Sequence, residues 1–174
     1  MPFSLVIGGT RSGKSEIAEA MLPKESRLVY LATAALSEEP EWLSRIEQHA
    51  RRRGGRFDLV EIADAASLGE LVRSATLPTL IDSVGTWLAR LLDLSDFAIL
   101  SLVSDLAESL ASSPVALAVV SEEVGMSIHP PTVLGRRFAD LMGEANQRLA
   151  AAASPVILAV AGIPVPIDAF RRKR

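Results

Sequence analysis

The sequence predicts an α/β fold, in which a mainly parallel sheet carries helices on both faces. Five continuous apolar runs of strand length recur along the chain, and longer helix-compatible stretches separate them. Continuous apolar runs, as opposed to alternating ones, are typical of strands that are buried on both faces of a parallel sheet. A length of 174 residues suits one such domain, spanning residues 1–174, and is short for two.

The predicted strands and helices alternate along the chain, which indicates βαβ units with right-handed crossovers. The predicted strands are Phe3–Ile7, Leu28–Leu31, Thr79–Ile81, Val115–Val120 and Val156–Val160. The predicted helices are Lys14–Met21, Glu41–Arg53, Ala66–Ser74, Val84–Leu92, Phe97–Ala111 and Leu134–Ala152. Open parallel sheets bind ligands beyond the carboxyl ends of their strands, so we expect the functional residues at that edge.

The composition limits the classes of function. A net charge of −3 indicates no basic face for a nucleic-acid partner. The absence of cysteine excludes disulfides, thiolate zinc sites and a cysteine nucleophile. No apolar run reaches the roughly twenty residues that cross a bilayer, and the start has no charged leader. We therefore expect a cytoplasmic protein without a membrane span.

The most specific motif is a glycine-rich segment between the first predicted strand and the first predicted helix. It reads G-G-T-R-S-G-K-S and fits the P-loop pattern G-x4-G-K-[ST] in full. In this pattern backbone N–H groups surround phosphate oxygens, the lysine reaches the β- and γ-phosphates, and the hydroxyl binds magnesium. The predicted fold is therefore of the P-loop NTPase type. The predicted nucleotide-binding residues of the segment are Gly8, Gly9, Thr10, Arg11, Ser12, Gly13, Lys14 and Ser15.

A P-loop calls for a carboxylate at the end of another strand to hold the metal ion. Asp82 directly follows the apolar run Thr79–Ile81, and together with Ser15 it is predicted to bind Mg²⁺. The alternative is that Asp82 caps the helix predicted over Val84–Leu92. The P-loop favours the metal role, because a bound nucleotide requires such a group.

The sequence also narrows the kind of nucleotide enzyme. GTP-binding switch proteins recognise guanine with an Asn-Lys-x-Asp stretch, whereas the only asparagine of this chain is Asn146, in Asn-Gln-Arg-Leu. A motor or large ATPase would need a longer chain. The remaining class of nucleotide enzyme is a compact kinase or nucleotidyltransferase that acts on a small molecule.

His49 lies among arginines on a stretch with helical periodicity. Trp42, Ile46 and His49 share one helix face, and Arg45 and Arg52 are neighbours of the histidine on the helix surface. An imidazole surrounded by guanidinium groups resists protonation, which leaves a neutral ring nitrogen as a nucleophile toward a phosphate held by the arginines. The alternative is a histidine that only packs against its neighbours beside a solvated basic run.

The chain resembles the bifunctional adenosylcobinamide kinase/adenosylcobinamide-phosphate guanylyltransferase family of cobalamin synthesis. The matching stretches run in order from the first strand to near the C-terminus. Besides the P-loop, they are Tyr30-Leu-Ala-Thr33, Arg45-Ile-x-x-His49 with Arg53, Asp82 with Trp87 and Leu91-Leu92, Glu123-Val-Gly-Met126 with Pro130, Gly135-Arg136 with Phe138, Gly143-x-x-Asn-Gln147 and Gly162-Ile-Pro164. One departure is Glu122, where the family usually has asparagine.

The resemblance implies a RecA-like P-loop fold and two reactions on one chain. The first would phosphorylate adenosylcobinamide with ATP or GTP, and the second would transfer GMP from GTP through a covalent guanylyl group on His49. It also implies a corrinoid substrate and a homo-oligomer, commonly a trimer. The further nucleotide contacts that it implies are Ala32, Thr33, Ala34, Ala50, Arg51, Arg52, Arg53, Glu61 and Asp82.

Two rival hypotheses follow from the residues alone. The first is an ordinary P-loop small-molecule kinase in which His49 is a packing residue. The second is a non-catalytic nucleotide sensor, whose P-loop would bind a nucleotide tightly with slow or absent turnover. A protein-bound GMP would separate the transferase from both.

Overall fold

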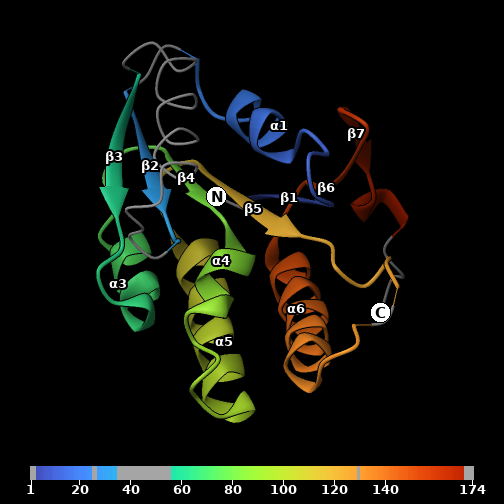
Figure 1. Cartoon of the computed structure of the whole chain (residues 1–174). Helices are drawn as coiled ribbons and strands as arrows, with labels where there is room; N and C mark the ends of the chain where they lie inside the picture. Colours follow the sequence, from blue (N-terminus) through green and yellow to red (C-terminus); the bar gives the residue numbers. More distant parts are fainter. Residues whose placement is uncertain (1–2, 25–26, 35–55, 129, 171–174) are drawn as a thin grey trace, which may run out of the picture.

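The computed structural model describes residues 3–24, 27–34, 56–128 and 130–170 (Figure 1). The described strands are β1 (Ser4–Gly8), β2 (Leu28–Ala32), β3 (Phe57–Glu61), β4 (Thr79–Asp82), β5 (Leu117–Glu122), β6 (Val156–Val160) and β7 (Ile163–Pro166). They form one sheet in the order β3-β2-β4-β5-β1-β6-β7. Every neighbouring pair is parallel except β6 and β7, so the predicted mainly parallel sheet is confirmed.

Helices cover both faces of this sheet, as predicted. The described helices are α1 (Lys14–Ala20), α3 (Leu68–Arg73), α4 (Val84–Ala89), α5 (Asp96–Ser112) and α6 (Val133–Ala152), with short 3-10 turns η1 (Ala65–Ser67) and η2 (Asp168–Phe170). Helix α1 lies on one side of the sheet, and α3 to α6 lie on the other (Figure 1). Among the described helices, none is both long enough and apolar enough to cross a membrane.

Alternation along the strands divides the core into two parts. Leu5 and Ile7 of β1 belong to the larger cluster, which α3 to α6 cover. Val6 between them points the other way, into a smaller cluster with Ala18 and Leu22 from the α1 side. Because both faces of the central strands are buried, their sequences read as continuous apolar runs.

The five predicted strands are confirmed, whereas β3 and β7 were missed. The sequence of β3, Phe-Asp-Leu-Val-Glu, contains two acids, and Leu59 is 48% exposed because this strand lies at the edge of the sheet. At the opposite edge, β7 contains Pro164 and Pro166. Proline lacks the N–H that a ladder needs, so it argues against a central strand but is tolerated at an edge.

The helix predictions hold with small shifts at their ends. The stretch Ala66–Ser74 divides into η1 and α3, and the helix predicted over Val84–Leu92 ends at Ala89. Two hydroxyl caps mark the starts of the long helices: Ser95 accepts from the backbone N–H of Ala98, and Thr132 accepts from that of Gly135. The helix predicted over Glu41–Arg53 lies outside the described residues.

Candidate functional site

The phosphate loop joins β1 to α1 in a tight turn. Ser12 donates its backbone N–H to the carbonyl of Gly9 at 3.3 Å, and Ile17 donates to the carbonyl of Gly13 at 3.1 Å, where α1 starts. Gly13 has a φ of 87°, a left-handed conformation that glycine adopts without strain. The strand–loop–helix context that the P-loop motif requires is therefore present.

Close packing at Gly8, where the loop begins, leaves no room for a larger residue. A Cβ atom on Gly8 would lie 2.4 Å from Oγ of Ser12 and 2.9 Å from the carbonyl oxygen of Ala159. The turn after β6 supports the loop, because Gly162 donates its N–H to the carbonyl of Ser12 at 2.9 Å. The Ser12 hydroxyl is buried without a hydrogen-bond partner among the described residues. It therefore retains a donor for a phosphate oxygen.

Lys14 lies in the first turn of α1, with its ammonium group close to the loop. Nζ donates to the carbonyl of Gly9 at 3.4 Å and lies 3.9 Å from Oε1 of Glu122. Both contacts are long, so they hold the ammonium group weakly. The lysine is therefore free to exchange them for the β- and γ-phosphates of a nucleotide in the loop.

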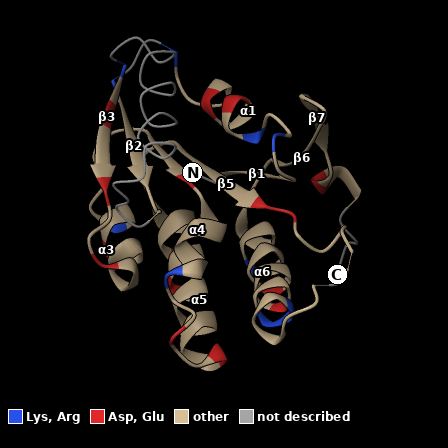
Figure 2. Cartoon of the chain, in the orientation of Figure 1, with Lys and Arg blue, Asp and Glu red and all other residues tan. Residues whose placement is uncertain are grey.

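The strand register brings predicted contact residues into one row. Ala32 of β2 pairs with Glu61 of β3 on one side and with Asp82 of β4 on the other. Farther along the sheet, Gly8 of β1 pairs with Glu122 of β5. Each of these residues is the last of its strand. They lie along the carboxyl edge of the sheet, and Figure 2 shows the acidic ends of β3 and β5 there.

Asp82 ends β4 as a half-buried carboxylate whose Oδ2 accepts a hydrogen bond from the Tyr30 hydroxyl at 3.1 Å. The cap of α4 is Ser83, which forms a capping box with Thr86. The alternative interpretation of Asp82 as the cap of this helix is therefore wrong. Asp82 lies at the carboxyl end of β4, on the edge of the sheet from which the phosphate loop also starts at the end of β1.

The oxygens present at this edge suit a magnesium ion. The hydroxyl of Ser15 and the carboxylate of Asp82 are hard oxygen ligands of the kind that Mg²⁺ prefers. Among the described residues, no group of three or more His, Cys, Asp or Glu side chains could hold a metal by itself. This donor set fits Mg²⁺ bound through substrate phosphates, because that ion keeps several waters and needs few protein ligands.

Thr33 joins the ends of β2 and β4 in the structure. Its buried hydroxyl donates to the carbonyl of Ser83 at 2.6 Å and accepts from the N–H of the same residue at 2.7 Å. The Oγ1 atoms of Thr33 and Thr86 are also 2.6 Å apart. The hydroxyl is thus fully used inside the protein. A nucleotide contact at Thr33, and at the half-buried Ala34 beside it, stays a prediction.

Arg90 is a residue of this edge that sequence reasoning missed. Its Nη1 donates to the carbonyls of Thr33 at 3.1 Å and Ile62 at 2.8 Å, and its Nη2 donates to that of Ala63 at 2.8 Å. One guanidinium group therefore braces the segments that follow β2 and β3. The only signal in the sequence is an arginine directly before the apolar pair Leu91-Leu92.

Asn146 of α6 holds the end of β5 and was likewise not predicted as a site residue. The Ser121 hydroxyl donates to Oδ1 of Asn146 at 2.6 Å, and Nδ2 of Asn146 donates to the carbonyl of Glu122 at 3.0 Å. Asn146 is 8% exposed. The bond pair fixes the backbone that carries Glu122 relative to the phosphate loop.

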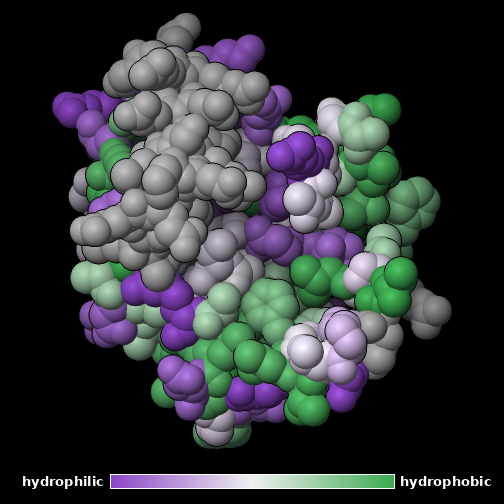
Figure 3. All heavy atoms as spheres, viewed as in Figure 1, coloured by the Kyte–Doolittle hydropathy of each residue, from purple (hydrophilic) through white to green (hydrophobic). Residues whose placement is uncertain are grey.

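A cavity of about 620 Å³ adjoins the phosphate loop. Its walls include residues 9–12 of the loop, Met126 in the turn after β5, and residues 158–161 at the end of β6. Met126 is 79% exposed, and Ile163 of β7 is 63% exposed. Figure 3 shows apolar surface on the side of the molecule where β7 lies. An apolar part of a substrate bound there would lie next to the phosphates.

The second group of predicted contacts lies outside the described residues. This group consists of His49 and the adjoining Ala50, Arg51, Arg52 and Arg53. Their roles stay predictions. Of the predicted nucleotide contacts outside the phosphate loop, the described ones are Ala32, Thr33, Ala34, Glu61 and Asp82.

Comparison with known structures supports the fold. A prototypical ATPase from the type III secretion system of pathogenic bacteria superimposes with a TM-score of 0.56 at 12% identity, covering 95% of this chain and 56% of that one. At this identity the likeness shows the fold alone. It confirms the P-loop NTPase-type, RecA-like architecture.

Comparison with known sequences identifies the family. A family model described as cobinamide kinase / cobinamide phosphate guanyltransferase matches residues 4–167. The bifunctional adenosylcobalamin biosynthesis protein CobU of Escherichia coli is 36% identical over 180 residues, covering 94% of this chain and 98% of its own. The protein of the same name from Salmonella typhimurium is 33% identical with the same coverage. The chain therefore belongs to the cobinamide kinase/cobinamide phosphate guanyltransferase family.

Proposed function

We propose that the kinase and guanylyltransferase activities of this enzyme use two neighbouring parts of the carboxyl edge of the sheet. As a member of its family the chain carries out both transfers in cobalamin biosynthesis, with a corrinoid and nucleotides as substrates. The observation that carries the proposal is that the phosphate loop with Lys14 and the carboxylate of Asp82 lie at the same edge of the sheet, at the carboxyl ends of the parallel strands β1 and β4, which β5 separates.

The kinase reaction is assigned to the phosphate loop. Backbone N–H groups of the loop and the ammonium group of Lys14 bind the triphosphate of ATP or GTP, while Ser15 and Asp82 hold Mg²⁺. When bound, Mg²⁺ neutralises negative charge on the β- and γ-phosphates. The aminopropanol hydroxyl of adenosylcobinamide then attacks the γ-phosphorus, and the nucleoside diphosphate leaves. Phosphoryl transfer depends mainly on positioning and charge neutralisation, which these groups supply.

The guanylyl transfer is assigned to His49. Its ring nitrogen attacks the α-phosphorus of GTP, and pyrophosphate leaves. The phosphate of adenosylcobinamide phosphate then displaces the histidine and gives adenosylcobinamide-GDP. A covalent intermediate divides one difficult displacement into two easier ones. The arginines beside His49 in the sequence support this role, because guanidinium groups bind phosphate oxygens bidentately.

The ends of β2 and β3 lie on the same edge of the sheet as the phosphate loop, which supports a nucleotide-binding role for the residues there. Ala32 and Glu61 face each other at these ends. Arg90 keeps the segments that follow the two strands in place. A nucleotide that reaches from these ends toward Asp82 would lie within one continuous edge of the sheet. We propose that Ala32, Thr33, Ala34 and Glu61 contact the guanine nucleotide there.

A covalent adduct tests this assignment directly. Intact-protein mass is measured after incubation with GTP and Mg²⁺. The wild type should gain the mass of one GMP, in a bond that acid cleaves and base leaves intact. His49→Ala should gain no such mass and should make no adenosylcobinamide-GDP. Its kinase activity should persist at least in part, because the phosphate-loop residues are unchanged.

The matched control is His129→Ala, which changes the other histidine of the chain and should keep the adduct. A GMP-sized adduct on His49→Ala would show that another residue is the acceptor. Loss of both activities together with a lowered melting temperature would favour a packing role for His49. No adduct on the wild type, with normal kinase turnover, would favour an ordinary small-molecule kinase.

We also propose a homo-oligomer, with a trimer as the expected state, and a place in the cytoplasm, where nucleoside triphosphates are available. Light scattering coupled to size-exclusion chromatography measures the first. A molecular mass of 18.6 kDa, that of one chain, would contradict it.

A further inference from the structure

Glu122 is not among the residues proposed to bind the nucleotide or Mg²⁺. It is the last residue of β5 and the register partner of Gly8, the first glycine of the phosphate loop. Its Oε2 accepts the backbone N–H of Gly85 at 2.7 Å, while its Oε1 lies 3.9 Å from Nζ of Lys14. One carboxylate oxygen is thus anchored to the start of α4, and the other faces the lysine that binds phosphate.

Several contacts build this placement. A Cβ atom at position 85 would lie 2.3 Å from Oε2 of Glu122, so a glycine is required for the anchoring bond. Asn146 holds the carbonyl of Glu122, and the N–H of Glu123 donates to the carbonyl of Gly8 at 3.0 Å. The carboxylate is therefore fixed by its own bond and by the backbone that carries it. A catalytic side chain has to be held in position by surrounding hydrogen bonds of this kind.

Two other acids at this edge, Glu123 and Asp82, have partners of their own. Oε1 of Glu123 accepts the backbone N–H groups of Gly125 at 2.6 Å and Met126 at 3.2 Å, within its own turn. Asp82 accepts from Tyr30 and is assigned to the metal. Among the described residues, Glu122 is the acid within 4 Å of the Lys14 ammonium group.

The ion pair with Lys14 does not by itself explain this arrangement. At 3.9 Å the two charged groups are beyond hydrogen-bond distance, so the contact holds neither side chain firmly. Once Lys14 binds the γ-phosphate, Oε1 lies close to phosphate oxygens, and two negative groups repel each other. A hydroxyl group between them removes the repulsion, because it donates its proton to the carboxylate and offers its oxygen to phosphorus.

We propose that Glu122 is the catalytic base of the kinase reaction. The acceptor hydroxyl donates to Oε1 and attacks the γ-phosphorus, so that a new O–P bond forms and the bond to the β–γ bridging oxygen breaks. The hydroxyl proton passes to Glu122, and the bond electrons leave with the nucleoside diphosphate. The proton is released to solvent after the product leaves. This inference rests on the kinase half of the proposed function.

The test compares Glu122→Gln with the wild type. Glutamine keeps the length of the side chain and an oxygen that accepts from Gly85, but it cannot take a proton. Kinase kcat on cobinamide should fall about 10²-fold or more. The dissociation constant for the nucleotide should stay unchanged or decrease, because a negative charge near the phosphates is removed. Formation of the GMP adduct should be unchanged, which also shows that the variant is folded.

Glu122→Asp gives an independent measurement, because aspartate keeps a carboxylate on a shorter stem. Its kinase kcat should lie between that of the wild type and that of Glu122→Gln. A Glu122→Asp rate no higher than the Glu122→Gln rate would contradict a role of the carboxylate in taking the proton.

The matched control is Glu144→Gln on α6, which removes a carboxylate paired with Arg148 far along the sequence from the loop. It should leave the kinase rate unchanged. A Glu122→Gln rate within threefold of the wild type would refute the base, and tighter nucleotide binding with a faster rate would show that Glu122 only restrains Lys14. A wild type without kinase turnover but with a GMP adduct would refute both this inference and the kinase assignment.

Discussion

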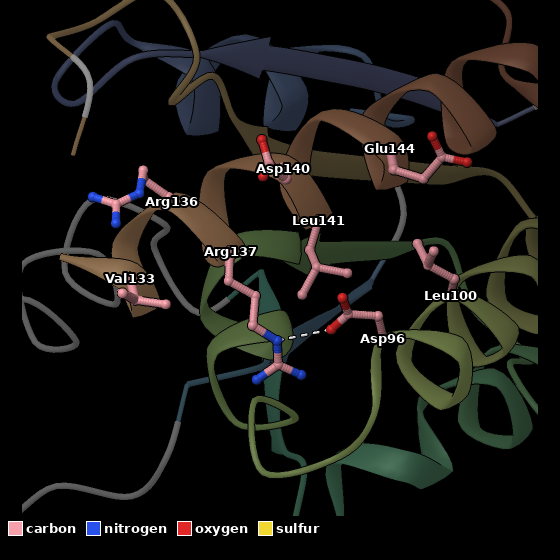
Figure 4. A pocket seen from close by; sticks show the side chains of 8 residues that line it. All are labelled: Asp96, Leu100, Val133, Arg136, Arg137, Asp140, Leu141 and Glu144. Atoms are coloured by element: carbon pink, nitrogen blue, oxygen red, sulfur yellow. Dashed lines mark hydrogen bonds and ion pairs between the residues drawn. The ribbon is translucent and has the colours of Figure 1, made fainter. Parts of the chain in front are cut away.

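Two regions of the molecule are rich in charged residues, and they use their charges differently. One is the carboxyl edge of the sheet around Lys14. The other is the groove between α5 and α6, a cavity of about 540 Å³ lined by two arginines, three acids and three apolar residues (Figure 4). In the groove, Arg137 donates to the carboxylate of Asp96 at 2.7 Å and to the carbonyls of Leu92 at 2.7 Å and Leu94 at 2.6 Å.

The two regions differ in how many short hydrogen bonds the protein supplies to its cationic side chains. All three nitrogens of the Arg137 guanidinium group have short bonds inside the protein, and Arg136 donates to the carbonyls of Pro130 and Pro131. Lys14 has one bond of 3.4 Å and one ion pair of 3.9 Å. A saturated cation holds segments together, whereas a loosely held one is available for a ligand. The contrast supports the nucleotide site proposed at the sheet edge and favours a structural role for the groove.

The largest effect on kinase activity is expected from a substitution of Lys14 in the phosphate loop. Lys14→Ala should lower kinase kcat by about 10²- to 10³-fold and weaken triphosphate binding, because backbone N–H groups alone cannot neutralise the β- and γ-phosphates. Kinase kinetics and nucleotide titration measure both effects. A kcat within a few-fold of the wild type would show that phosphoryl transfer occurs elsewhere. Lys24→Ala, outside the loop, is the control that should change neither quantity.

A smaller effect is expected for Asp82→Asn. The amide is nearly isosteric with the carboxylate and can still accept from Tyr30, so the fold should remain intact. The magnesium concentration that gives half the maximal kinase rate should rise at least about tenfold. The measurement is a magnesium titration at saturating nucleotide. An unchanged titration curve would remove Asp82 from the metal site.

The smallest effects on activity should come from the two arginines that bind carbonyls. Arg90→Met and Arg137→Met each leave carbonyls without a donor, and each should destabilise the fold by about 1–3 kcal/mol, measured by urea unfolding. Only Arg90→Met should also slow formation of the GMP adduct, because Arg90 braces the segments after β2 and β3. If GMP adduct formation slowed equally in both variants, Arg90 would have no special part in the guanylyl transfer.

Local features of the site were predictable from the sequence. The phosphate loop depends on a few adjacent residues, and its left-handed turn at Gly13 is a property of glycine itself. Asp82 was predicted because it follows an apolar run directly, and its place at the end of β4 is confirmed. Each of the two signals spans only a few residues, so no long-range contact is needed to recognise it.

Edge strands and bracing residues were not predictable in the same way. The bond from Gly85 to Glu122 joins residues 37 apart, and that from Arg90 to Thr33 joins residues 57 apart. The sequence around each residue resembles an ordinary helix or strand end. Their roles emerge only when the sheet order brings β2, β4, β5 and β1 side by side.

The sequence by itself determined the fold class, the phosphate loop and the family, because apolar runs and a short glycine-rich motif specify buried strands and a local backbone turn. The tertiary structure decided which polar groups are satisfied and which remain available. That distinction depends on distances between residues remote in the chain. It separates Lys14, held by two long contacts, from Arg137, saturated by short ones, and it directs one oxygen of Glu122 to the lysine of the P-loop motif.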